Sequence, residues 1–495
     1  MRALALSGWL VAAACSQAPT TPPPAKAPAR AVPIGESNIA PADYVGPDAC
    51  GECHPTQHAL WSASLHRVMN AQAGDPGAVV GDFSGAVVKY RGGEVHFDRD
   101  LSGYLVRTKL GDSEVTYRVT RTIGHRGLQE YVGVEQGRTE EVRLPFGWWP
   151  RAGGWSPQVA FDPWLDEASF DPFAPVREPW AERCPWCHST YPFAQRIARA
   201  SGPRAVGHGL EQYFETAPGS DRLAVAEQVT TGISCESCHL GGRAHAAGAG
   251  ITAVPQAPRR EGAPSLPATF AEQRADATVV NTICAQCHSG PSPRLSDGTA
   301  LRNSSEALDL AASSCKAKCT DCHDPHVADS RGDEAKAVKA CIGCHETFAA
   351  PEHAGQGHAT TTCLDCHMPK LVMGIDRYVR THRISSPTNA ALLTEGAPNA
   401  CNLCHLDRPI AWTLDELRAG WSVRLPASIE GAYGDAAVGD VWLASKTPAI
   451  RLVAAHAYAR SPLGRYALDA LRRGLTDPLP YVRAWMQFAL DEIER

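Results

Sequence analysis

The stretch Cys363-Leu364-Asp365-Cys366-His367 decides the fold of this chain, because its pattern, Cys-x-x-Cys-His, occurs eight times in 495 residues. The cysteines of the eight copies are Cys50, Cys53, Cys184, Cys187, Cys235, Cys238, Cys284, Cys287, Cys319, Cys322, Cys341, Cys344, Cys363, Cys366, Cys401 and Cys404. The histidines that close them are His54, His188, His239, His288, His323, His345, His367 and His405. Of the 18 cysteines in the chain, only Cys15 and Cys315 lie outside the motifs.

The motif has a direct chemical explanation. Cys-x-x-Cys-His is the attachment pattern of haem c: two thiols one helical turn apart add to the two vinyl groups of one haem. The adjacent histidine is then placed under the iron as its proximal ligand. A zinc site instead pairs two Cys-x-x-Cys units around one ion and needs no histidine after each pair. A redox dithiol is usually single. The sequence therefore predicts eight covalent haem c groups.

The first residues predict export. Residues 1–15 contain Arg2, an apolar run and then Cys15 after small residues, which is typical of an export signal with a lipoprotein cleavage site. Ordinary cleavage nearby is the alternative. The run is too short to span a bilayer. Residues 16–45 are rich in proline and alanine and are expected to form a linker, either a tether or a plain disordered tail. We therefore expect a periplasmic or outer-membrane lipoprotein of a Gram-negative-type bacterium, with membrane contact through Cys15.

The rest of the chain is expected to form three regions and a mainly α fold with much irregular loop, packed around eight haems. Residues 46–180 hold the first motif, a tryptophan-rich loop and, at about 82–146, an inserted antiparallel β meander, predicted from alternating stretches around glycine-containing turns. Residues 181–410 hold the other seven motifs. Residues 411–495 carry amphipathic helices that resemble HEAT-like repeats and are expected to form a helical cap.

The motif contexts resemble those of multihaem cytochromes of the c-552/c-554 type, within the superfamily of hydroxylamine oxidoreductase and cytochrome c nitrite reductase. The resemblance rests on Trp61-x-x-Ser64-x-His66, Gly81-Asp82-Phe83, Leu128-Gln129-Glu130-Tyr131 and the sequences around the motifs, such as CPWCHST at 184–190 and CLDCHMP at 363–369. It covers roughly residues 44–410. The chain departs from the nitrite reductase pattern because it has no Cys-x-x-Cys-Lys motif. No tyrosine could be matched to the haem cross-link of hydroxylamine oxidoreductase.

A low-spin electron carrier needs a second strong axial ligand on each iron. The chain has five methionines and 19 histidines, so a second histidine is the expected ligand. The resemblance favours His66, His245, His326 and His382 in this role. His125, His208, His353 and His358 are the remaining candidates. His58, His96 and His456 are expected to be surface or structural groups, and Cys315 a buried free thiol, with a thiolate ligand or an intermolecular disulfide as alternatives.

These features predict an electron-transfer cytochrome of the cell envelope. We expect it to carry electrons between a membrane-associated donor and an external or periplasmic acceptor. The expected partners are redox proteins, either a quinol-linked membrane donor or other cytochromes. The formal charge of −6 makes nucleic acid an unexpected partner. One alternative is a multihaem oxidoreductase acting on a small nitrogen or sulfur compound at an open iron, whose catalytic residues the sequence leaves unknown. Another is a scaffold subunit that docks partners through its C-terminal repeats.

Overall fold

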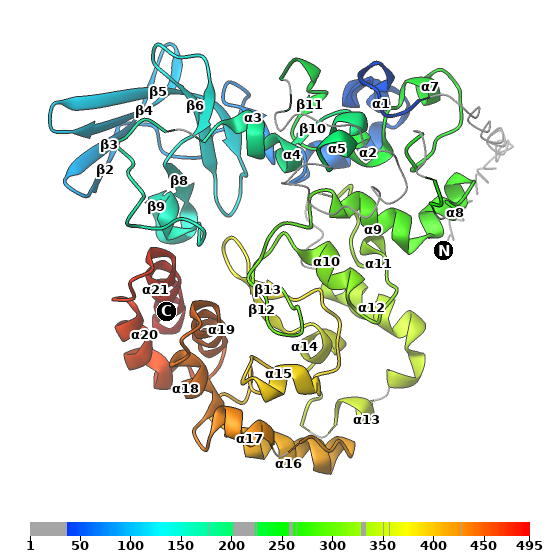
Figure 1. Cartoon of the computed structure of the whole chain (residues 1–495), viewed down its shortest axis with the longest axis vertical. Helices are drawn as coiled ribbons and strands as arrows, with labels where there is room; N and C mark the ends of the chain where they lie inside the picture. The colour runs from blue at the N-terminus through cyan, green and yellow to red at the C-terminus, as the bar shows by residue number, and fades with distance from the viewer. Residues whose placement is uncertain are drawn as a thin grey trace, which may run out of the picture.

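The computed structural model describes residues 37–176, 178–200, 223, 225–256, 261–263, 265–327, 333–349, 351–355, 357–426 and 428–495. The predicted export signal, Cys15 and most of the predicted linker lie outside these residues. The architecture is mixed α/β, with one antiparallel sheet and many short helices (Figure 1). In the part of the chain described, no helix combines the length and apolar character needed to cross a membrane.

The predicted β meander is present. Its strands follow one another in chain order as neighbours in the sheet, and every pair is antiparallel. They are β2 (Ala86–Tyr90), β3 (Gly93–Asp100), β4 (Gly103–Leu110), β5 (Ser113–Ile123), β6 (Glu130–Glu135) and β7 (Glu141–Arg143), with β1 (Asn70–Gln72) pairing β5. Alternation buries one face: Val95 and Phe97 of β3 are fully buried, and the ring of Trp155 stacks on Phe97 with centroids 3.6 Å apart.

Three two-stranded antiparallel sheets were not predicted. They are β8 (Phe146–Trp149) with β9 (Gly154–Pro157), β10 (Ser189–Thr190) with β11 (Thr230–Thr231), and β12 (Lys370–Met373) with β13 (Tyr378–Arg380). The first belongs to the tryptophan-rich loop, and it joins distant parts of the chain. Trp149 packs its ring edge-on against Phe488, with centroids 4.8 Å apart. The sheet region therefore contacts the C-terminal helix directly.

The segment with the dense motifs consists of short helices and loops that run between the sheet and the C-terminal cap (Figure 1). With the two helices around the first motif, these helices are α1 (Pro47–Cys53), α2 (Pro55–Ser62), α3 (Trp180–Arg183), α4 (Pro185–His188), α5 (Phe193–Ala200), α6 (Cys235–His239), α7 (Arg243–Ala246), α8 (Phe270–Ala275), α9 (Ala277–Ala285), α10 (Glu306–Ala311), α11 (Cys319–Cys322), α12 (Glu334–Cys344), α13 (Pro351–Ala354), α14 (Cys363–His367) and α15 (Ala390–Thr394). Few residues of α11 and α12 are buried by protein alone, as expected if haems supply much of the apolar contact.

The C-terminal region is helical, as the amphipathic pattern predicted. It contains α16 (Ile410–Trp421), α17 (Ser428–Tyr433), α18 (Val438–Leu443), α19 (Pro448–Ala459), α20 (Leu468–Gly474) and α21 (Pro480–Glu494). Its core is continuous with Leu403 and Leu406 of the last motif and with Tyr378 of β13. His456 of α19 is fully buried here: its Nε2 lies 3.1 Å from the Trp485 carbonyl and its ring stacks on Tyr378. This location agrees with a structural role.

Candidate haem-binding sites and their axial ligands

Each motif forms a tight turn that sets its three side chains. In six of them the N–H of the histidine donates to the carbonyl of the first cysteine at 2.9–3.2 Å; these histidines are His54, His188, His288, His323, His345 and His405. His239 and His367 end the short helices α6 and α14. This one-turn geometry places both thiols and the imidazole where a single haem can meet them.

Five motif histidines lie opposite a second histidine. The ring centroids of each pair are 6.1–6.3 Å apart. The pairs are His54 with His245, His239 with His326, His323 with His382, His367 with His353, and His405 with His358. Four pairs have rings within 27° of parallel, whereas the rings of His405 and His358 are nearly perpendicular, at 86°.

This spacing fits two imidazoles on opposite sides of one iron. A bond from a metal to an imidazole nitrogen is about 2.0 Å, and the ring centroid lies about 1.1 Å beyond the nitrogen, so two axial imidazoles place their centroids about 6.2 Å apart. Direct stacking of two rings would bring the centroids much closer together. The paired residues therefore fit haem, which supplies one-electron chemistry at its iron when bound.

The surroundings keep several of these rings neutral and oriented for ligation. Burial and the nearby His326, His54 and His245 lower the pKa of His239 to about 4, so the ring is neutral at pH 7, the form that binds a metal. Nδ1 of His367 lies 2.9 Å from the Ser385 carbonyl, and Nδ1 of His245 lies 3.2 Å from the Ala249 carbonyl. These contacts direct Nε2 of each ring toward an iron.

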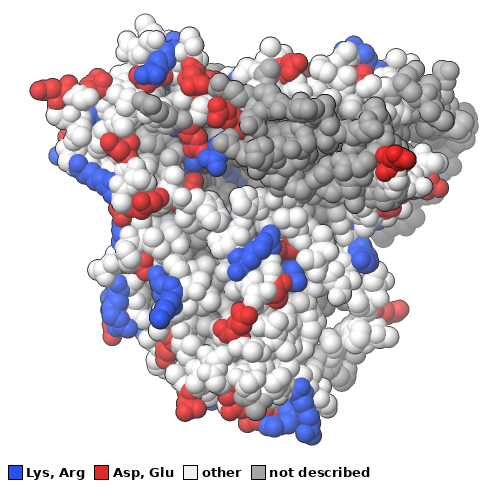
Figure 2. Space-filling view, in the orientation of Figure 1, with Lys and Arg blue, Asp and Glu red and all other residues white. Residues whose placement is uncertain are grey.

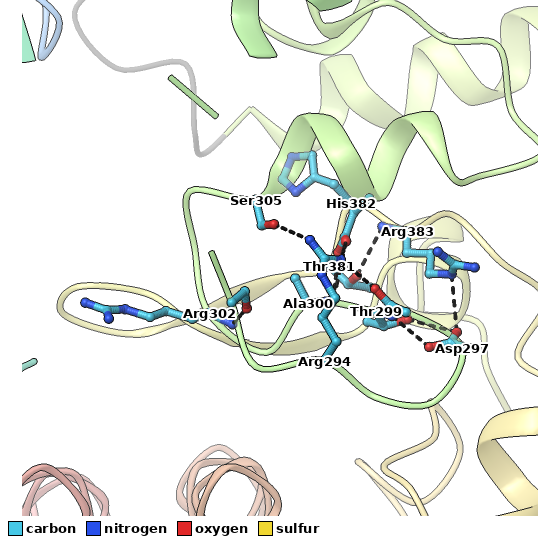
Figure 3. Close-up of polar contacts among 12 residues, drawn as sticks. Arg294, Asp297, Thr299, Ala300, Arg302, Ser305, Thr381, His382 and Arg383 are labelled. Atoms are coloured by element: carbon cyan, nitrogen blue, oxygen red, sulfur yellow. Dashed lines mark hydrogen bonds and ion pairs between the residues drawn. The ribbon is translucent and has the colours of Figure 1, made fainter. Parts of the chain in front are cut away.

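His382 shows how the fold fixes a distal candidate. It follows β13, and its own carbonyl accepts from Ser313 Oγ at 3.3 Å, while Ile384 N donates to the same Oγ at 2.8 Å. Nε of the neighbouring Arg383 lies 3.4 Å from the buried Asp297 carboxylate. Figure 3 shows the His382 ring and the Arg383 side chain pointing in different directions from this loop. The ion pair thus anchors the loop while the imidazole stays available for an iron.

Comparison with known proteins agrees with this geometry. No protein-family model matches the chain. Dissimilatory sulfite reductase MccA of Wolinella succinogenes is 24% identical over 247 residues, which are 43% of this chain and 32% of that protein. The match thus spans about a third of the length of that relative.

The chain is a multihaem cytochrome c.

Two solved structures share a general likeness with this cytochrome. The outer cell wall cytochrome OcwA is 16% identical, with a TM-score of 0.41, over 91% of this chain and 98% of that one. The octahaem sulfite reductase MccA of Wolinella succinogenes is 15% identical, with a TM-score of 0.38, over 94% of this chain and 85% of that one.

His66 is the remaining distal candidate that the structure brings to a motif. Burial lowers its pKa, and the nearby rings of His288 and His326 lower it further. His66 is thus close enough to His288 of the fourth motif and to His326 to feel their charges, although no ring contact pairs it with either among the described residues. It is the candidate for the second axial position there, in addition to the five ring pairs.

The structure gives no such support to the other two candidates. His125 lies in the turn after β5, where its Nε2 is 3.3 Å from the Gly77 carbonyl, and no ring contact joins it to a motif histidine among the described residues. His208 lies outside the described residues. His58 contacts the Trp61 ring, and His96 lies 3.4 Å from Glu94 on β3, as expected for surface or structural groups.

Two motif histidines lack a histidine partner within the described part of the cytochrome. His188 is partly buried beside the Trp180 ring, 6.5 Å away between centroids. Its motif lies under the sheet, where Cys184 packs on Ile123 and Val132. His345 has the Phe348 ring as its neighbour, at 6.1 Å. These two irons are therefore the candidates for a different sixth ligand.

The motifs lie against one another in a series. Thiols of different motifs lie close enough to influence one another's ionisation. These pairs are Cys50 with Cys235, Cys238 with Cys287, Cys187 with Cys287, Cys284 with Cys319, Cys322 with Cys341, Cys341 with Cys363, and Cys366 with Cys401. Helix packing follows the same order: α1 contacts α6, α9 contacts α11, α11 contacts α12, and α12 contacts α14. The leftover Cys315 lies near Cys322 and Cys341 within this series.

Sequence reasoning missed the partners that lie behind the ligands. Ser385 behind His367 and Glu306 behind His288 carry no motif that would mark them. Ser385 acts through its backbone carbonyl, which any residue type could provide. Glu306 lies 18 residues from its histidine, across an irregular loop.

Proposed function

We propose that this chain is an octahaem electron-transfer cytochrome of the cell envelope, held to a membrane by a lipid on Cys15. The observation that carries the proposal is the closeness of the motifs: α1 packs on α6, and α9, α11, α12 and α14 pack on one another in turn. In addition, thiols of every motif lie near a thiol of another motif. Haems attached at such cysteines would be close neighbours. Iron with two histidine ligands changes oxidation state with little rearrangement, which suits electron transfer.

The protein contributes binding, orientation and exclusion of water. The cysteines hold each porphyrin, the paired histidines fix each iron, and backbone carbonyls such as that of Ser385 fix the ligand tautomer. Electrons would enter from a membrane-associated donor and leave to an external or periplasmic acceptor, with other redox proteins as partners. On the face in Figure 2, acidic and basic side chains are interspersed among the described residues. A redox partner that binds this face would therefore not need a surface with only positive or only negative charge.

The haem count tests this proposal. Protein matured with a full haem-attachment system is expected to carry eight covalent haems by intact mass, because all eight motifs are complete. A rapid-mixing experiment with a small reductant should then reduce all haems together, since neighbouring motifs are in contact. Six or fewer haems under full maturation would contradict the proposal. A group of haems that is reduced much more slowly than the others would also contradict it.

A second candidate is an oxidoreductase for a small sulfur or nitrogen compound at the second motif. It is favoured by His188, because the described residues place the Trp180 ring and no second histidine ring beside it. The relative MccA is a sulfite reductase.

Electron paramagnetic resonance separates the two candidates. If the second is right, the oxidised protein shows a high-spin ferric haem whose signal disappears when sulfite, nitrite or cyanide is added. A spectrum with low-spin haems alone, unchanged by these anions, would leave electron transfer as the function.

A further inference from the structure

The proximal histidine of the fourth motif has a carboxylate behind it. Nδ1 of His288 lies 3.2 Å from Oε2 of Glu306, the first residue of α10. The other carboxylate oxygen accepts from the backbone N–H of Ser304 at 2.8 Å. The start of α10 also docks on the motif itself, because Ala307 N donates to the His288 carbonyl at 3.0 Å. Backbone contacts therefore hold the Glu306 carboxylate in place against the ring.

The other ligand histidines have different partners. Nδ1 of His367 and of His245 face neutral backbone carbonyls. Asp324 lies 3.4 Å from Nδ1 of His326, but its Oδ1 accepts from the backbone N–H of His326 at 3.0 Å. The His288 ring, in contrast, hydrogen-bonds to a carboxylate.

A carboxylate on Nδ1 changes what the imidazole does at a metal. The negative charge attracts the Nδ1 proton and makes the ring a stronger electron donor at Nε2. Electron donation stabilises ferric over ferrous iron and lowers the reduction potential. The iron gains or loses one electron, while the proton stays on the imidazole. A neutral carbonyl in the same position has a weaker effect.

The fourth motif has several motifs as neighbours, so a change in the reduction potential of its haem would affect electron transfer among them. Cys287 contacts Cys187 of the second motif and lies near Cys238 of the third, while Cys284 contacts Cys319 of the fifth. The fourth motif therefore has the second and third motifs as neighbours on one side and the fifth motif on the other. Glu306 also lies near His382, the distal candidate for the fifth motif.

We propose that Glu306 is a positioning residue that lowers the reduction potential of the haem held by Cys284, Cys287 and His288. This haem would then stay mostly oxidised while electrons pass between its neighbours. The proposal depends on the proposed function, because it requires a haem at this motif.

Replacing Glu306 by glutamine tests it, because glutamine can keep a hydrogen bond while the charge is removed. In the fully matured Glu306→Gln protein, a redox titration followed by electron paramagnetic resonance should show one haem favouring the reduced state about tenfold more, a rise of about 59 mV for one electron. The control Asp324→Asn removes a carboxylate near a ligand ring without a ring hydrogen bond and should shift its haem less. The variant His382→Met marks the fifth haem, so that its titration can be distinguished.

The outcomes separate the two proposals. The inference is supported if one reduction midpoint potential rises in Glu306→Gln but not in Asp324→Asn. Both variants must also keep eight haems, each in the spin state that it has in the parent. Eight haems with every midpoint unmoved overturns the inference alone and leaves the proposed function intact. A parent protein without a haem at the fourth motif, shown by mass of the peptide around Cys284, overturns both. Glu306→Asp retains the charge and should keep the potential closer to that of the parent than glutamine does.

Discussion

Replacing His382 by alanine is expected to convert one low-spin haem into a high-spin one. The ring of His382 lies opposite that of His323 at 6.1 Å between centroids, the spacing of two ligands on one iron. Removing it leaves that iron with a single protein ligand. Because each distal histidine serves one motif, the other low-spin signals should remain. Electron paramagnetic resonance of the oxidised protein measures the change directly. We expect one low-spin signal to disappear and one high-spin signal to appear.

Matched variants make this prediction specific. His96→Ala removes a histidine from β3, where its partner is Glu94, and should leave every haem signal unchanged. His382→Met offers a thioether sulfur in the same place and should restore a six-coordinate iron with a higher potential than the parent. If His382→Ala retains all low-spin signals, or if His96→Ala loses one, the ligand assignment from ring pairing is wrong.

The sequence predicted what depends on local pattern. The Cys-x-x-Cys-His spacing is local, and so is the alternation that places Val95 and Phe97 on one face of β3. The distal partners are not local: His54 meets His245 across most of the first half of the chain. Counting histidines could suggest candidates, but only folding decides which ring faces which motif.

The elements that the sequence did not predict have the same cause. The two-stranded sheet of β10 with β11 has two residues in each strand, too few to show an alternating pattern. Its partners come from segments far apart in the sequence. Short elements of this kind form because tertiary contacts hold them, and local propensity gives no signal of them.

Replacing Arg143 by methionine is expected to destabilise the protein by about 3 kcal/mol, because it leaves the largely buried Glu130 without its cation and takes one of two cations from Asp162 and Glu178. Arg143 of β7 has a side chain only 13% exposed, and it contacts Glu130, Asp162 and Glu178. Burial opposes its charge, but these three carboxylates more than compensate and raise its pKa. The cluster joins the sheet to the segment that leads into the second motif. Urea unfolding followed by circular dichroism measures the loss.

The pH dependence of this loss distinguishes charge from packing. Without Arg143, the clustered carboxylates lose part of their compensating positive charge, and protonation relieves their mutual repulsion in the folded variant more than in the unfolded chain. Stability of the variant should therefore recover as the pH falls, and its deficit against the parent should be smaller at pH 5 than at pH 8. A deficit that is equal at both pH values would mean that packing of the arginine stem, rather than its charge, was lost. The control Arg138→Met removes a 62% exposed partner of Glu135 and should change stability by at most about 1 kcal/mol at either pH.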